Sequence, residues 1–173
     1  MPELIGHPSH IINQGSPMSN PNELSPFHFN EGSIELPAAW KDLSVLVLSA
    51  ADNDKSGISF TISRDVIAWG MSFNQFGESE ISSLSNQLKD YQQINKEDRE
   101  LNARKTIISE FSWSSPQGPI HQLMMLLDLT PKVLVFTATI PGNMTDEQRQ
   151  QIGLLMNTFQ LRDTAAAGTA EAQ

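Results

Sequence analysis

The chain of 173 residues contains no cysteine. Without a thiol it can form no disulfide framework, no cysteine-ligated metal site, no thiolate nucleophile and no thiol-linked lipid anchor. Basic residues are also scarce. The chain has 11 Lys and Arg but 20 Asp and Glu, which gives a net charge of −9. Phosphate backbones and anionic membrane surfaces reward basic patches. We therefore expect neither nucleic acid nor a lipid surface as the partner.

Long apolar runs are absent as well. The longest is LMMLL at 123–127, far short of the roughly 20 residues that span a bilayer. The first residues, MPELIGHPSHIINQGSPMSNPNELSP, are polar and proline-rich and lack the pattern of a secretory signal. We expect a soluble, cytoplasmic protein that does not insert into membranes.

No catalytic or metal-binding motif is complete. DNDKSG at 52–57 matches the start of a calcium loop, but Ser63 occupies the position that needs a bidentate carboxylate. His7 and His10 are close in sequence, yet they fit no zinc motif. Nucleophile-elbow, dinucleotide and P-loop motifs are missing. We therefore expect no metal, no cofactor and no enzymatic activity.

Composition divides the chain into three regions. Residues 1–25 are rich in Pro, Ser, Asn and Gly, which predicts a flexible N-terminal arm. The sequence RDTAAAGTAEAQ at 162–173 follows the last large apolar residue and predicts a flexible tail. One folded domain is expected over 26–161, a length that is sufficient to bury a core.

Apolar periodicity predicts seven strands and two helices. The strands are expected around Phe27 and Phe29, around Ile34 and Leu36, and at 45–48, 58–62, 102–113, 119–129 and 132–140. Three-to-four spacing predicts one helix from Ile81 to Ile94. A capping box at Thr145 and Gln148 opens the second helix. The order ββββ-α-βββ-α predicts an α+β fold with a largely antiparallel sheet.

The segment GISFTISRDV at 57–66 alternates large apolar residues with hydroxyl residues. A strand with this pattern has an apolar face and a face that carries Ser59, Thr61 and Ser63. The hydroxyl face is either an ordinary surface in contact with water or a binding surface, and the pattern leaves both interpretations open.

The apolar strands exceed what two short helices can cover. VLVL at 45–48 is apolar at every position, so we expect it to be covered on both faces. The surplus either packs internally or in a homodimer, or forms an open sheet face that binds an apolar partner. Met124 and Met125 suit such a face, because flexible thioethers adapt to irregular ligands.

Four segments in order resemble the DcrB-related family and, more narrowly, the Eag chaperones of type VI secretion systems. They are FHFNEGSIELPAAWKDLSVLVL, SFTISRD, GPIHQLMMLLD and VLVFTATIPGNMTDEQRQQI. The resemblance covers about residues 24–160 and identifies 26–161 as a DcrB-like chaperone domain. It implies a PsbP-like fold, a curved and largely antiparallel sheet of about seven strands with two helices.

The resemblance also implies a function. Eag chaperones are cytoplasmic homodimers that shield the N-terminal transmembrane helices of PAAR-containing effectors, including Rhs toxins, before export. No catalysis and no cofactor are involved. The alternative hypothesis is a module that binds a small molecule or a lipid on the same concave sheet face.

By resemblance, the hydroxyl face lines the groove that holds the effector helices. Membrane helices pack through small residues and through hydrogen bonds of Ser, Thr and Gln, so a sheet face that mixes these with Val could imitate a neighbouring helix. Met124 and Leu126 are included because they share one strand face with Gln122. The expected helix-binding residues are Val45, Val47, Ser59, Thr61, Ser63, Gln87, Gln122, Met124 and Leu126.

Overall fold

The computed structural model describes residues 24–29, 31–37, 40–49 and 57–162. The chain divides into two compact units, Met1–Asp42 and Leu43–Gln173. In the first unit, β1 (Leu24–Phe29) and β2 (Gly32–Pro37) form an antiparallel hairpin.

Most of the predicted arm and tail lies outside these ranges. The described residues include only Leu24 and Ser25 of the arm and Arg162 of the tail.

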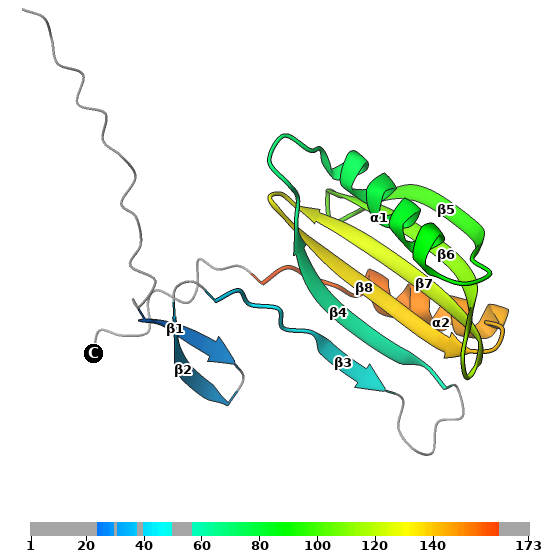
Figure 1. Cartoon of the computed structure of the whole chain (residues 1–173), viewed down its shortest axis with the longest axis horizontal. Helices are drawn as coiled ribbons and strands as arrows, with labels where there is room; N and C mark the ends of the chain where they lie inside the picture. Colours follow the sequence, from blue (N-terminus) through cyan, green and yellow to red (C-terminus); the bar gives the residue numbers. More distant parts are fainter. Residues whose placement is uncertain (1–23, 30, 38–39, 50–56, 163–173) are drawn as a thin grey trace, which may run out of the picture. The chain divides into compact units, whose positions relative to one another are not determined.

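The second unit is a six-stranded antiparallel sheet with one helix against each face (Figure 1). The strand order is β3-β4-β8-β7-β6-β5. The strands are β3 (Leu46–Ser49), β4 (Ser59–Val66), β5 (Gln92–Leu101), β6 (Arg104–Ser115), β7 (Gly118–Leu129) and β8 (Lys132–Pro141). The helices are α1 (Phe73–Gln87) and α2 (Asp146–Asn157). The α+β class is therefore confirmed, with eight described strands in place of about seven.

The prediction of a helix over 81–94 is wrong at both ends. Helix α1 begins earlier, where the Ser72 hydroxyl and the Gln75 amide form a capping box. It ends before Asp90, whose left-handed backbone (φ 54°) turns the chain into β5. Ile94 matched the helical period, but it lies on this additional strand and is half exposed. The capping box predicted at the start of α2 is present.

Each face of the sheet buries its own apolar cluster. The α2-side cluster comprises Phe60, Leu123, Met125, Leu127, Phe136, Ala138, Ile140, Met144, Ile152 and Met156. The α1-side cluster comprises Ile67, Phe73, Phe76, Ile81, Ile107, Phe111, Met124, Leu126 and Val133. Alternation along β7 explains why the LMMLL run is apolar throughout, since its side chains supply both clusters in turn.

Helix α1 approaches the sheet closely at Gly77. A Cβ atom at this position would lie 2.3 Å from Cδ1 of Ile107. The absence of a side chain therefore allows the helix to pack directly on β6. Neither described helix is both long and apolar enough to cross a membrane.

Candidate functional site

Helix α1 covers only part of its side of the sheet. Its cluster includes residues of β6 and β7 and, on β8, the buried Val133, with Val135 partly buried against it. In Figure 1, β3 and β4 lie beyond the helix. We call the uncovered part the open face. Its side chains are those of Val47, Ser49, Ser59, Thr61, Ser63, Thr137 and Thr139, with Val135 at the border of the α1-side cluster. Val45, one residue before β3, continues the row of Val47 by alternation.

The strand register places these side chains on one surface. Thr61 is directly opposite Val47 on β3 and directly opposite Thr137 on β8. Residues directly opposite each other in antiparallel strands project from the same side of the sheet. The neighbouring rows repeat the pattern, so the open face is a band of Val, Ser and Thr across three strands.

The open face includes large apolar side chains in contact with water. Val45 and Val47 are 52% and 62% exposed. On the other side of the same strand, Leu46 and Leu48 are 50% and 48% exposed. The prediction that 45–48 is covered on both faces is therefore wrong for the single chain. The reason is that β3 is an edge strand, and among the described residues only β4 pairs with it.

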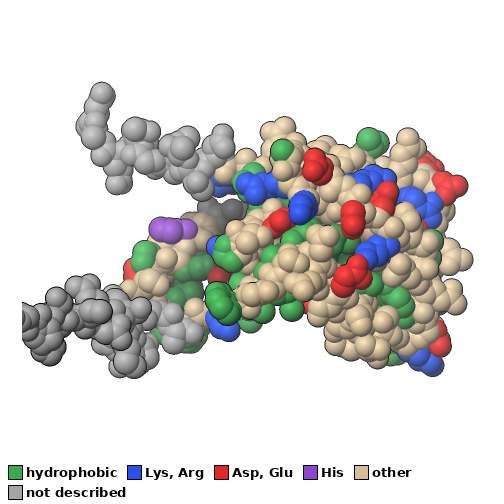
Figure 2. Space-filling view, turned by 90° about the horizontal axis from the view of Figure 1, so that it is seen from above, with side chains coloured by type: hydrophobic (Ala, Val, Ile, Leu, Met, Phe, Trp, Pro, Cys, Tyr) green, Lys and Arg blue, Asp and Glu red, His purple; other side chains and the backbone are tan. Residues whose placement is uncertain are grey.

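The opposite edge strand, β5, has a different character. It carries Lys96, Glu97, Asp98, Arg99 and Glu100 in succession. Figure 2 shows acidic and basic side chains interspersed over the face that it views. Charges on an edge strand oppose pairing with other strands, whereas an exposed apolar edge favours it. The open face therefore lies at the edge that is suited to a partner.

Two glutamines border the open face. Nε1 of Trp113 donates a hydrogen bond to Oε1 of Gln122 at 2.9 Å, and Nε2 of Gln122 donates to Oγ1 of Thr139 at 2.9 Å. Gln87 on α1 donates to Oγ of Ser83 at 2.7 Å. These bonds hold both glutamine side chains in defined positions.

The orientation of α1 places Gln87 on the side of the open face. Glu78 forms an ion pair with Lys96 of β5, so this flank of the helix faces β5. At 100° per residue, Glu80 and Gln87 lie roughly 180–200° around the helix from Glu78. They therefore belong to the flank nearest to β8 and β4.

The predicted helix-binding residues fall into three groups. Five of them belong to the open face: Val47, Ser59, Thr61 and Ser63 lie in its paired rows, and Val45 directly precedes β3. Gln87 and Gln122 lie at its border. Met124 and Leu126 share the same side of the sheet, but they are 5% and 0% exposed beneath α1. These two side chains can support the site, but they offer no surface to a partner.

The prediction omitted the contribution of β8. Val135, Thr137 and Thr139 extend the open face beyond β4. The segment KVLVFTATI at 132–140 already shows this alternation, with apolar residues between these three. The same period that marked the hydroxyl face of β4 would have identified them.

The open face leaves its hydroxyl groups largely available. Oγ1 of Thr61 donates to the carbonyl oxygen of Thr137 at 3.5 Å, which is at the limit of a hydrogen bond. Ser59 and Ser63 are partly exposed. Short hydroxyl side chains permit close approach and can donate or accept a hydrogen bond.

A second polar cluster is buried on the α2 side. Arg149 of α2 forms a bidentate ion pair with Glu110, with Nε to Oε2 at 2.9 Å and Nη2 to Oε1 at 2.8 Å. The backbone N–H of Met144 donates to Nδ1 of His121 at 3.0 Å. The proton of this ring therefore lies on Nε2, which donates to Oε1 of Glu110 at 2.8 Å.

The partners of Glu110 decide its charge. Burial raises the pKa of this carboxyl group, but the hydrogen bonds from Arg149 and His121 outweigh burial and hold the pKa below its ordinary value. The cluster contains no nucleophile, and each of its polar groups has a partner. It connects α2 to β6 and β7, which is a structural role.

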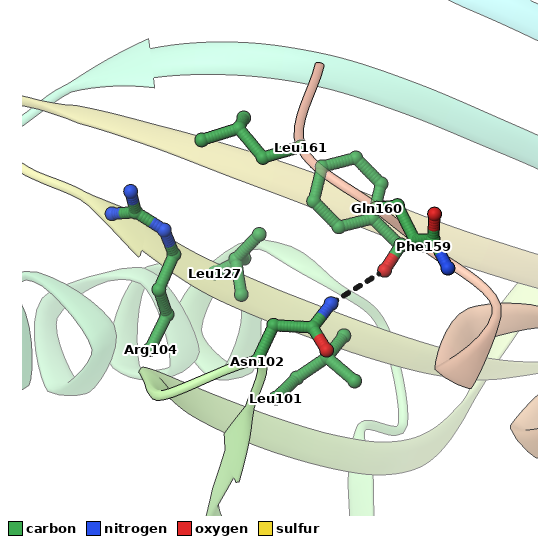
Figure 3. Close-up of a pocket in the computed structure, with 7 residues that line it drawn as sticks. All are labelled: Leu101, Asn102, Arg104, Leu127, Phe159, Gln160 and Leu161. Carbon is green, nitrogen blue, oxygen red and sulfur yellow. Dashed lines mark hydrogen bonds between the residues drawn. The ribbon is translucent and has the colours of Figure 1, made fainter. Parts of the chain in front are cut away.

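A hollow of about 390 Å³ also lies on the α2 side (Figure 3). Leu101, Leu127 and Phe159 contribute apolar walls, and Arg104 lies at the side. Nδ2 of Asn102 donates to the carbonyl oxygen of Phe159 at 2.8 Å and ties the β5–β6 turn to the segment after α2.

The part of the chain that the structure describes has no cluster of three side chains suited to hold a metal ion. His7, His10 and most of the DNDKSG segment lie outside this part.

An antiparallel sheet with a helix on each face and one uncovered apolar and hydroxyl surface defines a small α+β protein with an open face. The DcrB family model matches residues 31–158, so the chain belongs to the DcrB family. No curated protein matches its sequence.

Three solved structures match this chain to different degrees. PA94 from Pseudomonas aeruginosa, a protein of unknown function, is 19% identical with a TM-score of 0.70 over 82% of this chain and 99% of that chain. Cyanobacterial PsbP (CyanoP) from Synechocystis sp. PCC 6803 is 9% identical, with a TM-score of 0.43 over 83% of this chain and 93% of that one. The Ran-binding protein Mog1p from Saccharomyces cerevisiae is 14% identical, with a TM-score of 0.39 over 76% and 83%.

Proposed function

We propose that this DcrB-family protein is a cytoplasmic secretion chaperone. It binds and shields the N-terminal transmembrane helices of a type VI secretion effector of the PAAR or Rhs type before export. It performs no catalysis and needs no cofactor. The observation that carries the proposal is the open face, a band of Val, Ser and Thr that α1 leaves largely uncovered on its own side of the sheet.

The chemistry of the open face suits a transmembrane helix. Such a helix exposes about 20 apolar residues when it leaves the membrane. In bilayers, helices associate through small residues and through Ser, Thr and Gln hydrogen bonds. Val47 and Val135 supply apolar contact, Thr61 and Thr137 supply hydroxyl groups, and all four side chains are short enough for close approach.

The edge strand β3 supports a homodimeric form of the proposal. Leu46 and Leu48 point away from the open face and are about half exposed. A second copy that covers this edge removes their apolar surface from water and leaves the open faces for the effector. Equilibrium sedimentation of the full chain tests this part, with a dimer expected at micromolar concentration and a monomer as the contradicting result.

Co-expression with the N-terminal fragment of a PAAR-containing effector from the same genome tests the chaperone proposal. The fragment is expected to stay soluble and to co-purify only when this protein is present. Val47→Asp is expected to abolish capture, because it places a charge in the open face. Val66→Asp is the matched control, since Val66 is also 62% exposed but lies on the other side of the sheet.

Thermal unfolding of both variants checks that the fold is intact. If the fragment is soluble alone, or if both variants capture it equally well, the proposal is wrong.

The alternative function is a module that binds a small molecule or a lipid. The hollow in Figure 3 favours it to a limited degree, but this hollow lies on the α2 side and not on the open face. Native mass spectrometry of protein purified from cells separates the two functions. A retained ligand of defined mass supports the alternative, and the bare chain or an effector complex supports the chaperone.

A further inference from the structure

Two carboxylates border the open face at one of its ends. Asp65 continues the row of Ser59, Thr61 and Ser63 along β4 and is directly opposite Val133. Glu80 lies on the flank of α1 that faces this strand. Burial raises the pKa of Glu80, and the nearby charge of Asp65 raises it further.

No basic side chain of the described residues neutralises this pair. Helix α1 contains no Lys or Arg, and its one ion pair within the described residues joins Glu78 to β5. Arg64 and Lys132 are close in sequence, but the alternation of β4 and β8 directs them to the α2 side. The open-face positions themselves are Val, Ser and Thr.

Among the described residues, the other end of the open face carries no charge. Ser59 and Thr139 pair there, and the Gln122 amide hydrogen-bonds to Thr139. The surface is therefore asymmetric along its length, with carboxylates beside the C-terminal half of β4 and neutral polar groups at its start.

The asymmetric charge of the open face suits a ligand that is apolar along its length and positively charged at one end. Transmembrane helices are mostly apolar, but Lys and Arg are concentrated just beyond one of their ends. When such a helix leaves the membrane, its cations keep their charge and favour a carboxylate over a neutral surface. A helix bound in one direction packs its apolar residues on the open face and places its cations beside the two carboxylates. In the reversed helix, the cations lie far from the carboxylates.

We infer that Asp65 and Glu80 fix the direction of the bound helix by pairing with a Lys or Arg that flanks one of its ends. This inference rests on the proposed function, because it assumes that the open face holds an apolar helix. The flanking cation lies beside the end of β4, and the uncharged end of the helix lies beside Ser59.

Synthetic peptides test the charge preference with the full-length chain. The probe is a 20-residue Leu/Ala/Ser helix with two Lys residues at one end, and the comparison peptide has two Glu residues there. Fluorescence anisotropy is expected to show about five- to tenfold tighter binding of the Lys peptide, the effect of one or two partly exposed ion pairs. Asp65→Asn with Glu80→Gln is expected to remove this preference.

The matched control removes the same two charges elsewhere. Asp98→Asn with Glu100→Gln changes β5, on the far side of α1, and is expected to keep the preference. If the control loses the preference as fully as the double variant at the open face, the effect is one of net charge and the inference is overturned.

The lack of cysteine allows a direct test of direction. Ser59→Cys and Ala68→Cys each introduce a single thiol, at the uncharged end of the open face and just beyond Asp65. A peptide with one cysteine beside its Lys pair is expected to form a disulfide with the Ala68→Cys chain and not with the Ser59→Cys chain.

The experiments distinguish failure of the inference from failure of the proposed function. Equal cross-linking of both chains by a peptide that binds overturns the inference and leaves the chaperone proposal intact. If neither peptide binds the wild-type chain, the proposed function fails, and the inference fails with it.

Discussion

The two halves of the α1 side of the sheet differ in what covers them. In one half, Ile107 and Leu126 are buried beneath α1, and the outermost strand, β5, carries many charged residues. In the other half, no described helix covers Val47 or Thr61, which are exposed and partly exposed, and the outermost strand, β3, is apolar. The protein protects one edge with charge and leaves the other apolar. This contrast supports the proposal that the open half is a surface for a partner.

The largest expected effect comes from forcing α1 off the covered half. Gly77→Leu is expected to lower the free energy of unfolding by about 2–3 kcal/mol, because the new side chain collides with the buried Ile107. Gly153→Leu in α2 is the control, since a Cβ there meets no atom within 4 Å. Urea denaturation measures both. Equal effects would mean that α1 does not pack closely on β6.

A second comparison uses one residue type on the same side of the sheet. Val133→Ala removes a fully buried side chain from the covered half and is expected to cost about 2 kcal/mol of stability. Val47→Ala removes a side chain that is 62% exposed on the open half and is expected to cost less than about 0.5 kcal/mol. Similar losses in the isolated chain would show that the open half is covered in solution.

Acid is expected to lower the free energy of unfolding, by a smaller amount than the core substitutions. The pKa of Glu110 is lower in the folded chain than its ordinary value of 4.5, so its stabilising contribution is complete above that value. The contribution is lost as the pH falls below 4.5 and through the folded pKa.

The measurement is urea denaturation of the wild type and of Glu110→Gln between pH 7 and pH 3. The stability advantage of the wild type is expected to be constant near neutral pH and to shrink in acid. Glu100→Gln, an exposed carboxylate on β5, serves as the control. A constant advantage across the whole range would contradict the assigned ion pairs.

Local patterns predicted much of this fold. The alternation of GISFTISRDV predicted the two faces of β4 correctly. Phe60 is buried on the α2 side, and Thr61 lies on the opposite side, in the open face. The capping box at Thr145 located the start of α2. Such features depend on neighbours within a few residues, so they are readable from the chain alone.

The failures arose where a local pattern was ambiguous. Tyr91 and Ile94 extended the helical period past the true end of α1, although Asp90 reverses the chain there. The signal that could have placed the helix is the Ser72 and Gln75 capping box, which precedes the apolar period. Periodicity over a few residues cannot decide between the end of a helix and the beginning of a strand.

The sequence by itself determined which side chains share a strand face, because alternation requires no knowledge of neighbouring strands. It also excluded thiol chemistry. Only the tertiary structure decided which of these faces are covered. Met124 and Thr137 are opposite each other on one side of the sheet, yet α1 buries the first and leaves the second partly exposed. The reason is that the burial of a strand face depends on where a helix packs across strands that are distant in sequence. No local period encodes that position.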